Sequence, residues 1–359
     1  MAKVTIQEVA REAGVALGTV SNVLNHPDRV RPETIERVRA AMDALGYAPN
    51  QSARLLAGGS SAVFGLILPH MTHGFPLQEA SGAQSEARRA GYDLIMLNSA
   101  GDPEIERANL RYLAGSQVAG ILIHPLCAQH VELPASRRAI PMVYQGVIGE
   151  GPGCRVAADR EKQGALVAEH AARSGAHHIA VFGRSFAPAE VDRARGIIHV
   201  AHDATVQFEF IDEGAPDRSR DGFEVGSKLM RRPACERPDF IIGLTDALAS
   251  GALAAVRAAG LRVPGDVAVA GCDGNPLAWI GDIPLTTVVP SGYEVGRRGV
   301  QLLIEQIELE KLAAFSGEPM DQDLSRQELI RPFLLQRASS VAGASLVGGM
   351  DFDVGAYLV

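Results

Sequence analysis

Residues 15–25, VALGTVSNVLN, place hydrogen-bonding side chains on one side of a short predicted helix. The apolar residues Val20, Val23 and Leu24 share one helix face. The polar residues lie around the other sides, and they are Thr19, Ser21, Asn22 and Asn25. Such a helix can pack on a small core by its apolar face and keep its hydroxyl and amide groups for a partner. The pattern therefore predicts a polar contact surface.

Groups typical of enzymes and metal sites are missing from the sequence. There is no GxSxG motif, no P-loop and no GxGxxG after the first predicted strand. The HxxH spacing in HVAHD, residues 199–203, lies on a predicted helix with no third ligand near it. The four cysteines are far apart and include no CxxC pair; they are Cys127, Cys154, Cys235 and Cys272. We expect no catalytic residues, no metal site and no cofactor.

Composition and charge are those of a globular protein with more than one domain. Of the 359 residues, 47% are hydrophobic and 21% are charged. The net charge is −8, yet residues 1–60 hold seven Lys/Arg and six Asp/Glu, which permits DNA binding without demonstrating it. No apolar run approaches the roughly 20 residues of a membrane span, and no secretory signal is present. We expect a cytoplasmic protein with no membrane partner.

The N-terminal segment has the pattern of three short helices, predicted over residues 6–13, about 17–24 and 33–45. Thr5 and Glu8 have the spacing of a capping box at the first helix, and Gly14 supplies the following turn. Gly46 closes the third helix, whose apolar residues follow a helical stripe. Three short helices around one small core predict a helix-turn-helix unit.

Residues after the linker Gly58-Gly59-Ser60-Ser61 alternate between apolar runs and amphipathic helices. Strands are predicted at 63–68, 92–97, 118–123, 140–145, 178–183, 239–244 and 267–271. Helices are predicted near 79–90, 104–115, 161–174, 188–202, 219–231, 246–260 and 291–312. Apolar strands joined by crossover helices are typical of parallel sheets buried on both faces. We predict an α/β core of two doubly wound lobes with a cleft between them.

The predicted domains are a helix-turn-helix domain (1–47), a hinge helix with linker (48–61), a two-lobed core (62–338) and a tail (339–359). The tail is rich in Gly, Ala and Ser, and it has no leucine heptad. We expect it to be a loose extension that forms no tetramerising coiled coil.

Six segments resemble the LacI/GalR family of bacterial transcription regulators. They are VTIQEVAREAGVALGTVSNVLN, VRPETIERVRAAMDALGYAPNQSARLLAG, DPEIERANLRYL, VAGILI, GLRVPGDVAVAGCDG and PLTTV. The likeness extends from about residue 4 to about residue 338. It implies a DNA-binding head and a core like the periplasmic sugar-binding proteins, which dimerises and senses a small molecule. It also implies a pseudo-palindromic operator, because a symmetric dimer presents two recognition helices.

The resemblance implies that residues 16–25 enter the major groove and that bases are contacted from Leu17, Gly18 and Asn22. The family usually has Arg at position 22, which pairs with guanine, whereas Asn favours adenine. Gly18 has no side chain, and Leu17 could pack on a thymine methyl group. Phosphate contacts suit the remaining polar residues of the helix, Thr19, Ser21 and Asn25, and Thr5 completes the DNA-binding set expected in the head. Alternatively, Leu17 and Asn22 are only surface residues of a small helical bundle.

Arg54 to Ala57 match the family's hinge helix. The resemblance implies that Leu56 is an apolar wedge in the minor groove, beside Arg54. Without the resemblance, ARLLAG is an ordinary linker helix.

The family's effector site corresponds to residues that follow the predicted strands, at the edge where ligands bind in such folds. The residues are His73, Phe75, Asp159, Arg193, Asp246, Asp273 and Trp279. Arg193 suits paired hydroxyls or a carboxylate, with a surface salt bridge as the alternative. Asp273 corresponds to the family's ligand-binding Asp, with a helix cap as the alternative, whereas Asp246 could equally cap its helix. Thr245 stands where the family has Asn.

The expected effector class is open. The family often has two aromatic residues after the first core strand, and this chain keeps only Phe75. The second lobe's aromatic position is replaced near Asp217. A carbohydrate is expected from the family, and a sugar acid or another small polar metabolite is also consistent.

We therefore predict a sequence-specific, homodimeric DNA-binding regulator, most simply a repressor, that associates with the nucleoid when bound. The alternative is a cytoplasmic small-molecule binding protein whose head no longer recognises DNA specifically.

Overall fold

The computed structural model describes residues 4–25, 29–47, 61–71, 74–126, 140–150, 153–183, 188–212, 218–275, 278, 282–316 and 325–343. The chain divides into two compact units, Met1–Ala62 and Val63–Val359. Among the described helices, none is both long enough and apolar enough to span a membrane.

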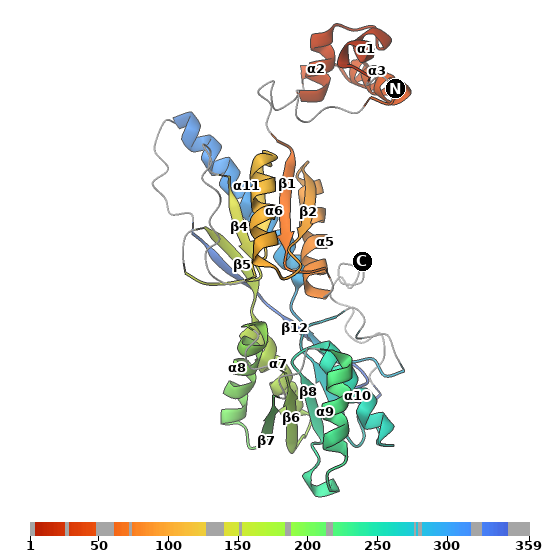
Figure 1. Ribbon diagram of the computed structural model, residues 1–359, viewed down its shortest axis with the longest axis vertical. Coiled ribbons are helices and arrows are strands. Elements are labelled where there is room, and N and C mark those ends of the chain that lie inside the picture. Colours follow the sequence, from red (N-terminus) through yellow and green to blue (C-terminus); the bar gives the residue numbers. More distant parts are fainter. Residues whose placement is uncertain are drawn as a thin grey trace. The chain divides into compact units, whose positions relative to one another are not determined.

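The first unit contains the three helices expected from the sequence, α1 (Ile6–Glu12), α2 (Leu17–Asn25) and α3 (Pro32–Leu45) (Figure 1). Thr5 caps α1: its hydroxyl accepts from the Glu8 amide at 3.4 Å, and its own amide donates to the Glu8 carboxylate at 2.7 Å. Gly46 ends α3 with a φ of 62°, a conformation that glycine adopts without strain. One small core joins the helices, and it contains Val9, Ala10, Ala13, Val20, Val23, Val38 and Ala41.

The second unit contains two six-stranded sheets, one in each lobe. The first sheet has the order β11 (Gln327–Ile330), β5 (Cys154–Ala158), β4 (Met142–Gln145), β3 (Gly120–Ile123), β1 (Val63–Leu68) and β2 (Asp93–Asn98). The second has the order β12 (Phe333–Leu335), β10 (Thr286–Val289), β9 (Ala268–Gly271), β8 (Phe240–Gly243), β6 (His178–Phe182) and β7 (Gln207–Ile211). Every neighbouring pair is parallel except β10 and β12. The predicted pair of doubly wound lobes is confirmed.

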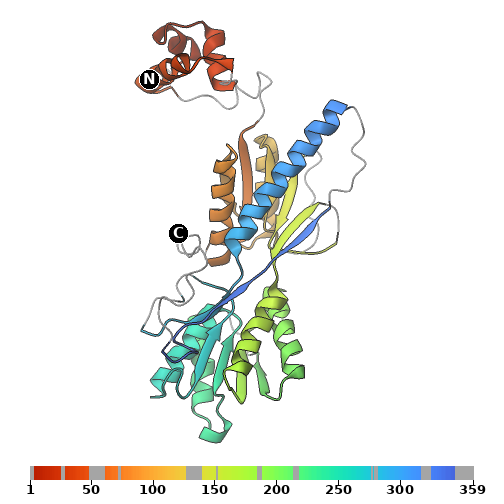
Figure 2. The same ribbon diagram turned by 180° about the vertical axis from the view of Figure 1, so that it is seen from behind.

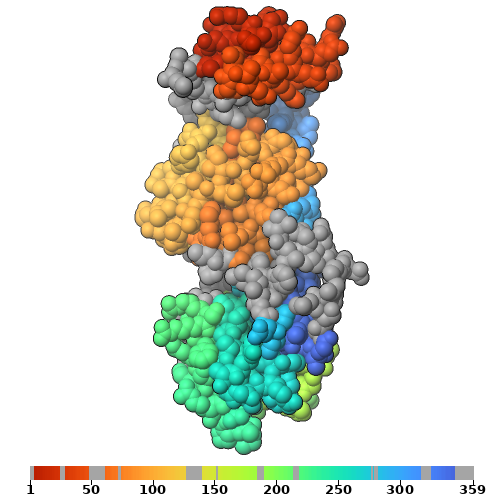
Figure 3. All heavy atoms as spheres, turned by 90° about the vertical axis from the view of Figure 1, so that its right-hand side faces the viewer, coloured from red at the N-terminus to blue at the C-terminus, as the bar shows by residue number. Residues whose placement is uncertain are grey.

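Helices cover both faces of each sheet. The first sheet has α5 (Gly74–Arg89) and α11 (Gly292–Ser316) on one face and α6 (Pro103–Gly115) on the other. The second sheet has α7 (Arg160–Arg173) and α8 (Pro188–Asp203) on one face, with α9 (Ser219–Met230) and α10 (Asp246–Ala258) on the other. In the space-filling view, α9 and α10 form much of the visible surface of the second lobe (Figure 3).

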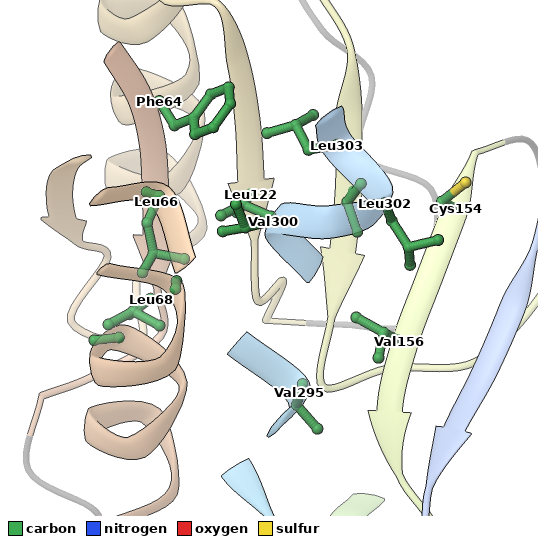
Figure 4. Packing of buried hydrophobic residues seen from close by; sticks show 14 of the residues in the cluster. Phe64, Leu66, Leu68, Leu122, Cys154, Val156, Val295, Val300, Leu302 and Leu303 are labelled. Atoms are coloured by element: carbon green, nitrogen blue, oxygen red, sulfur yellow. The ribbon is translucent and has the colours of Figure 1, made fainter. Parts of the chain in front are cut away.

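The alternation of side chains along β1 explains this layering. Phe64, Leu66 and Leu68 point to the face covered by α5 and α11, where they pack with Val300 (Figure 4). Ile67 points the other way, into the core under α6. Because successive side chains of a strand face opposite sides, an unbroken apolar run suits a strand buried on both faces.

The chain crosses between the lobes three times. It leaves the first sheet after β5, returns after β10 and leaves again between β11 and β12. The helix α11 follows β10 of the second sheet but packs on the first (Figure 2). All three crossings follow the last residue of a strand, so strand ends from both lobes meet at the crossing region.

The structure departs from the sequence-based expectation in three places. The strands β5, β7, β10, β11 and β12 were not predicted. The helix α5 begins at Gly74, five residues before the expected start, so Phe75 lies in its first turn. The expected loose tail does not begin at residue 339, because Ser339 and Ser340 are buried and the Ser339 hydroxyl donates to the Val269 carbonyl at 2.6 Å.

Candidate functional site

The helix α2 exposes the side that its residue pattern and the family resemblance predict to contact DNA. Val20 and Val23 are buried in the small core of the first unit. Leu17 is 46% exposed, and Gly18 and Asn22 are exposed as well. A Cβ atom added at Gly18 would meet no atom within 4 Å, so the helix surface is open there. Thr19 and Ser21 are half-buried at the edges of this surface.

The second unit contains a cavity of about 180 Å³ at the carboxyl ends of strands from both lobes. It is lined by Pro69, His70, Phe75, Pro76, His124, Ala158, Arg160, Gln163, Glu190, Arg193, Thr245, Asp273 and Pro290. This is the edge at which doubly wound sheets bind ligands. Beside the cavity, the Gln78 side chain of α5 donates to the Gly274 carbonyl of the second lobe at 3.2 Å. The two lobes are therefore in direct contact next to the candidate site.

The wall from the first lobe combines an aromatic ring with a hydrogen-bonded histidine and a buried carboxylate. The Phe75 ring meets the His124 ring edge-on, with 6.2 Å between the ring centroids. The Nδ1 atom of His124 lies 2.7 Å from a carboxylate oxygen of Glu79, which is fully buried in α5. The carboxylate fixes the position of the imidazole ring at the cavity. The retained aromatic residue Phe75 therefore lies in the predicted site.

Two arginines line the cavity. Arg193, from α8, is only 7% exposed, and its Nη1 atom donates to the Leu244 carbonyl at 2.7 Å. This burial rules out the alternative of a surface salt bridge for Arg193. Arg160, the first residue of α7, also lines the cavity and was not predicted from the sequence. Burial lowers the pKa of Arg160, and the positive charge of Arg193 lowers it further.

Asp246 and Asp273 are adjacent, but only Asp273 lines the cavity. Asp273 accepts from the Asp246 amide at 2.8 Å, so it satisfies the first amide of α10 while it contributes to the cavity wall. Asp246 is 2% exposed and accepts from the Thr287 hydroxyl at 2.6 Å and from the Asn275 amide at 2.7 Å. Burial, followed by the negative charge of Asp273, raises the pKa of Asp246 well above its ordinary value. Asp246 therefore stabilises the cavity wall through these hydrogen bonds without lining the cavity.

Asp159 and Thr245 each lie directly before a residue of the site or its support, and each caps a helix. Asp159, predicted to bind the effector, caps α7 by accepting from the Lys162 amide at 2.9 Å, and the cavity lining does not include it. Thr245 caps α10 through the Leu248 amide at 3.3 Å, so the cap alternative considered for Asp246 belongs to Thr245.

Some predicted site residues lie outside the described residues. These are Arg54 and Leu56 of the expected hinge helix, with His73, Asp217 and Trp279 near the expected effector site. Asn25 ends α2, but its side chain is also outside the description. Conversely, four cavity residues were not predicted from the sequence: His124, Arg160, Gln163 and Glu190. His70, at the start of the loop expected at the site, lines the cavity as well.

Two family models match the chain. Residues 5–50 match the lacI family of bacterial regulatory proteins, and residues 168–339 match a periplasmic binding protein-like domain. The transcriptional repressor PurR of Vibrio vulnificus is 31% identical over 316 residues, covering 84% of this chain and 92% of that protein. The chain belongs to the lacI family of bacterial regulatory proteins. Catabolite control protein A of Staphylococcus xylosus is 29% identical, covering 86% of this chain and 94% of that protein.

Solved structures show the same fold for this lacI-family chain. A lac repressor bound to ONPG in its repressed state aligns with a TM-score of 0.72 at 23% identity, covering 94% of this chain and all of that one. A lac repressor dimer bound to operator and the anti-inducer ONPF aligns with the same TM-score at 22% identity, covering 95% and 100%. The family assignment made from the sequence motifs is confirmed. The prediction of a regulator rather than an enzyme is confirmed as well, because the curated relatives are regulators.

Proposed function

We propose that this lacI-family repressor binds a pseudo-palindromic operator as a homodimer and that a small molecule in the cavity controls its operator affinity. The observation that carries the proposal is one chain with two recognition surfaces, the exposed side of α2 and the cavity of the second unit. A regulator that responds to a small molecule needs both surfaces. A transport-type binding protein needs only the second.

The exposed side of α2 supplies both kinds of DNA contact. Leu17 and Asn22 contact base edges, Leu17 through a thymine methyl group and Asn22 through an adenine. Thr19 and Ser21, at the edges of the same surface, contact phosphates and fix the orientation of the helix. Because no positively charged residue occurs between Ala16 and Asn25, sequence preference in this helix depends on neutral contacts.

Effector control requires that the effector bind two states of the core with different affinity. The cavity is lined by both lobes, and the hydrogen bond from Gln78 to Gly274 joins them beside it. A ligand that contacts both walls favours the closed arrangement of the lobes. By thermodynamic linkage, operator DNA changes effector affinity by the same factor as the effector changes operator affinity.

Selection of genomic fragments tests this function. The purified full-length protein is mixed with sheared DNA from its source organism at about 0.15 M salt, because salt determines how much nonspecific binding remains. The bound fragments are sequenced, with an Asn22→Ala and Leu17→Ala double variant as the matched control. Enrichment of one pseudo-palindrome by the parent protein, and its loss in the double variant, supports the proposal.

The second candidate function is a small-molecule binding protein whose head has lost sequence specificity. It is favoured by Gly18, which offers no side chain to the bases. It predicts that the parent protein and the double variant enrich the same fragments. Such a result, obtained both without a ligand and with a cavity ligand present, would refute operator binding.

A further inference from the structure

The two arginines of the cavity form an incompletely paired cationic wall. Arg160 and Arg193 come from adjacent helices of the second lobe, and the positive charge of Arg193 contributes to lowering the pKa of Arg160. The Nε atom of Arg193 is buried without a hydrogen-bond partner. Within the described part of the chain, neither guanidinium group forms a salt bridge with a carboxylate. Like charges at a partly dehydrated site are unfavourable unless an anion lies near both.

The carboxylates nearest to this wall are engaged in other interactions. Glu79 contacts the His124 ring at 2.7 Å in the first lobe. Asp192 pairs with Arg195 at 3.2 Å on the outer side of α8. Asp273 accepts from the first amide of α10. The negative charges of Glu79 and Asp192 partly offset the lowering of the Arg160 pKa. The two carboxylates that line the cavity itself are Asp273 and Glu190.

The rest of the cavity provides hydrogen-bonding groups for hydroxyls. Gln163, the fourth residue of α7, is fully buried, and its Nε2 atom donates to the Cys272 carbonyl at 2.8 Å. Its Oε1 atom is buried without a partner and belongs to a residue that lines the cavity. An unpaired buried acceptor costs free energy that a ligand hydroxyl can recover. Asp273 and Glu190 add further acceptors to the wall.

We propose that the effector is a small anionic polyol whose acidic group lies between Arg160 and Arg193 and whose hydroxyls bind Gln163 and Asp273. Paired guanidinium groups bind carboxylates and phosphates through charge-assisted hydrogen bonds, and both kinds of acid share this chemistry. A neutral sugar would bring no opposite charge to the two guanidinium groups, neither of which forms a salt bridge within the described residues. This inference rests on the proposed function, because a ligand of the cavity is an effector only if it controls DNA binding.

Calorimetric titration of the full-length protein without DNA tests the proposal. Two matched pairs of probes are used: D-gluconate with D-glucitol, and D-glucose 6-phosphate with D-glucose. At least one anion should bind about 10- to 100-fold more tightly than its neutral partner. The pair with the larger ratio distinguishes a carboxylate ligand from a phosphate ligand. Equal affinity within both pairs, or no binding of either anion up to about 10 mM, overturns the proposal.

The variant Arg160→Gln separates a ligand-binding role from a structural one. It should lower anion affinity about 10-fold, leave neutral-probe affinity unchanged and raise the Tm of the ligand-free protein by about 2 °C, because a cation beside Arg193 is removed. The control is Arg257→Gln, in the same lobe, where the arginine pairs with Asp282 at 3.1 Å away from the cavity lining. It should keep the anion preference. A lower Tm for Arg160→Gln with an unchanged preference would show a structural residue and refute the proposal.

These outcomes are independent of the operator experiment. Anion preference is measured without DNA, so a failure to enrich an operator contradicts the proposed function alone. A missing anion preference contradicts only the effector class.

Discussion

The exposed side of α2 and the cavity of the core recognise their partners in opposite ways. Leu17 and Asn22 extend from the surface of a nine-residue helix whose other face is buried. Arg193, Gln163 and Asp273 are held by hydrogen bonds to backbone groups of neighbouring elements. Recognition and stability are therefore separable on α2, whereas in the cavity the same atoms contribute to both.

The largest effect that this comparison predicts is in the support of the cavity. Asp246→Ala removes the acceptor of Thr287 and of the Asn275 amide and should lower the free energy of unfolding of the core by about 3 kcal/mol. The measurement is urea denaturation, monitored by tryptophan fluorescence and circular dichroism. Asp159→Ala is the control, because losing an N-cap costs only about 1 kcal/mol. Equal losses of unfolding free energy in the two variants would show that Asp246 contributes no more to stability than a helix cap.

The next effect lies on α2 and should leave stability unchanged. Asn22→Ala should weaken operator binding about 30-fold, from the roughly 2 kcal/mol that one base contact contributes, while the Tm and the affinity for random DNA stay the same. Fluorescence anisotropy with both DNAs at one salt concentration measures this. Asn22→Arg should transfer the preference at one operator position from adenine to guanine. An equal loss on operator and random DNA would place Asn22 at a phosphate.

The dependence of stability on pH should show the contribution of Asp246 to the core. Because the pKa of Asp246 is raised in the folded state, the folded protein retains a proton that the unfolded chain has released. This contribution to stability is complete below about pH 4, the ordinary pKa of aspartate, and declines as pH rises through the raised pKa, by about 1.4 kcal/mol per pH unit. Asp246→Asn should abolish the decline, measured as unfolding free energy against pH. A parallel decline in the variant would assign it to other groups.

The smallest effect concerns the cap of α1. Thr5→Ala removes the hydroxyl that accepts from the Glu8 amide and should destabilise the head by about 1 kcal/mol. Hydrogen exchange in the intact protein should then be faster in residues 4–25 and unchanged in the core. Thr5→Ser, which keeps the hydroxyl, is the control and should exchange at nearly the parental rate. Faster exchange throughout the core would show that the two units are energetically coupled.

Much of the fold follows from the sequence because its strands are continuous apolar runs. Among the strands that were missed, β5 and β10 have polar residues in buried positions, whereas β7, β11 and β12 contain no buried residue. Arg155 is 1% exposed within β5, where its guanidinium group lies 4.9 Å from the centroid of the Tyr144 ring. Thr286 and Thr287 are fully buried in β10. Their hydroxyl groups have hydrogen-bond partners in distant segments, Ser340 and Asp246 respectively. Local pattern cannot reveal partners that only the tertiary structure supplies.

The same limit applies to the site. Arg193 and Asp273 were predicted from the family resemblance, and both line the cavity. Arg160 was missed because an arginine in the first turn of a helix, directly after the cap Asp159, has the pattern of a solvated residue. Its position two residues after the end of β5 was the available signal, since that edge of a parallel sheet faces the ligand site.

The three crossings between the lobes have a consequence for protein synthesis. The first lobe takes its strand β11 and its helix α11 from the last quarter of the chain, after the whole second sheet except β12 has been made. A ribosome that has completed residue 290 has therefore produced every helix of the second lobe but an incomplete first lobe. Prematurely terminated chains lack α11, which leaves one apolar face of β3, β4 and β5 uncovered, so we expect them to be substrates for chaperones and proteases. The head has all its helices within the first 45 residues and needs no later part of the chain for its own core.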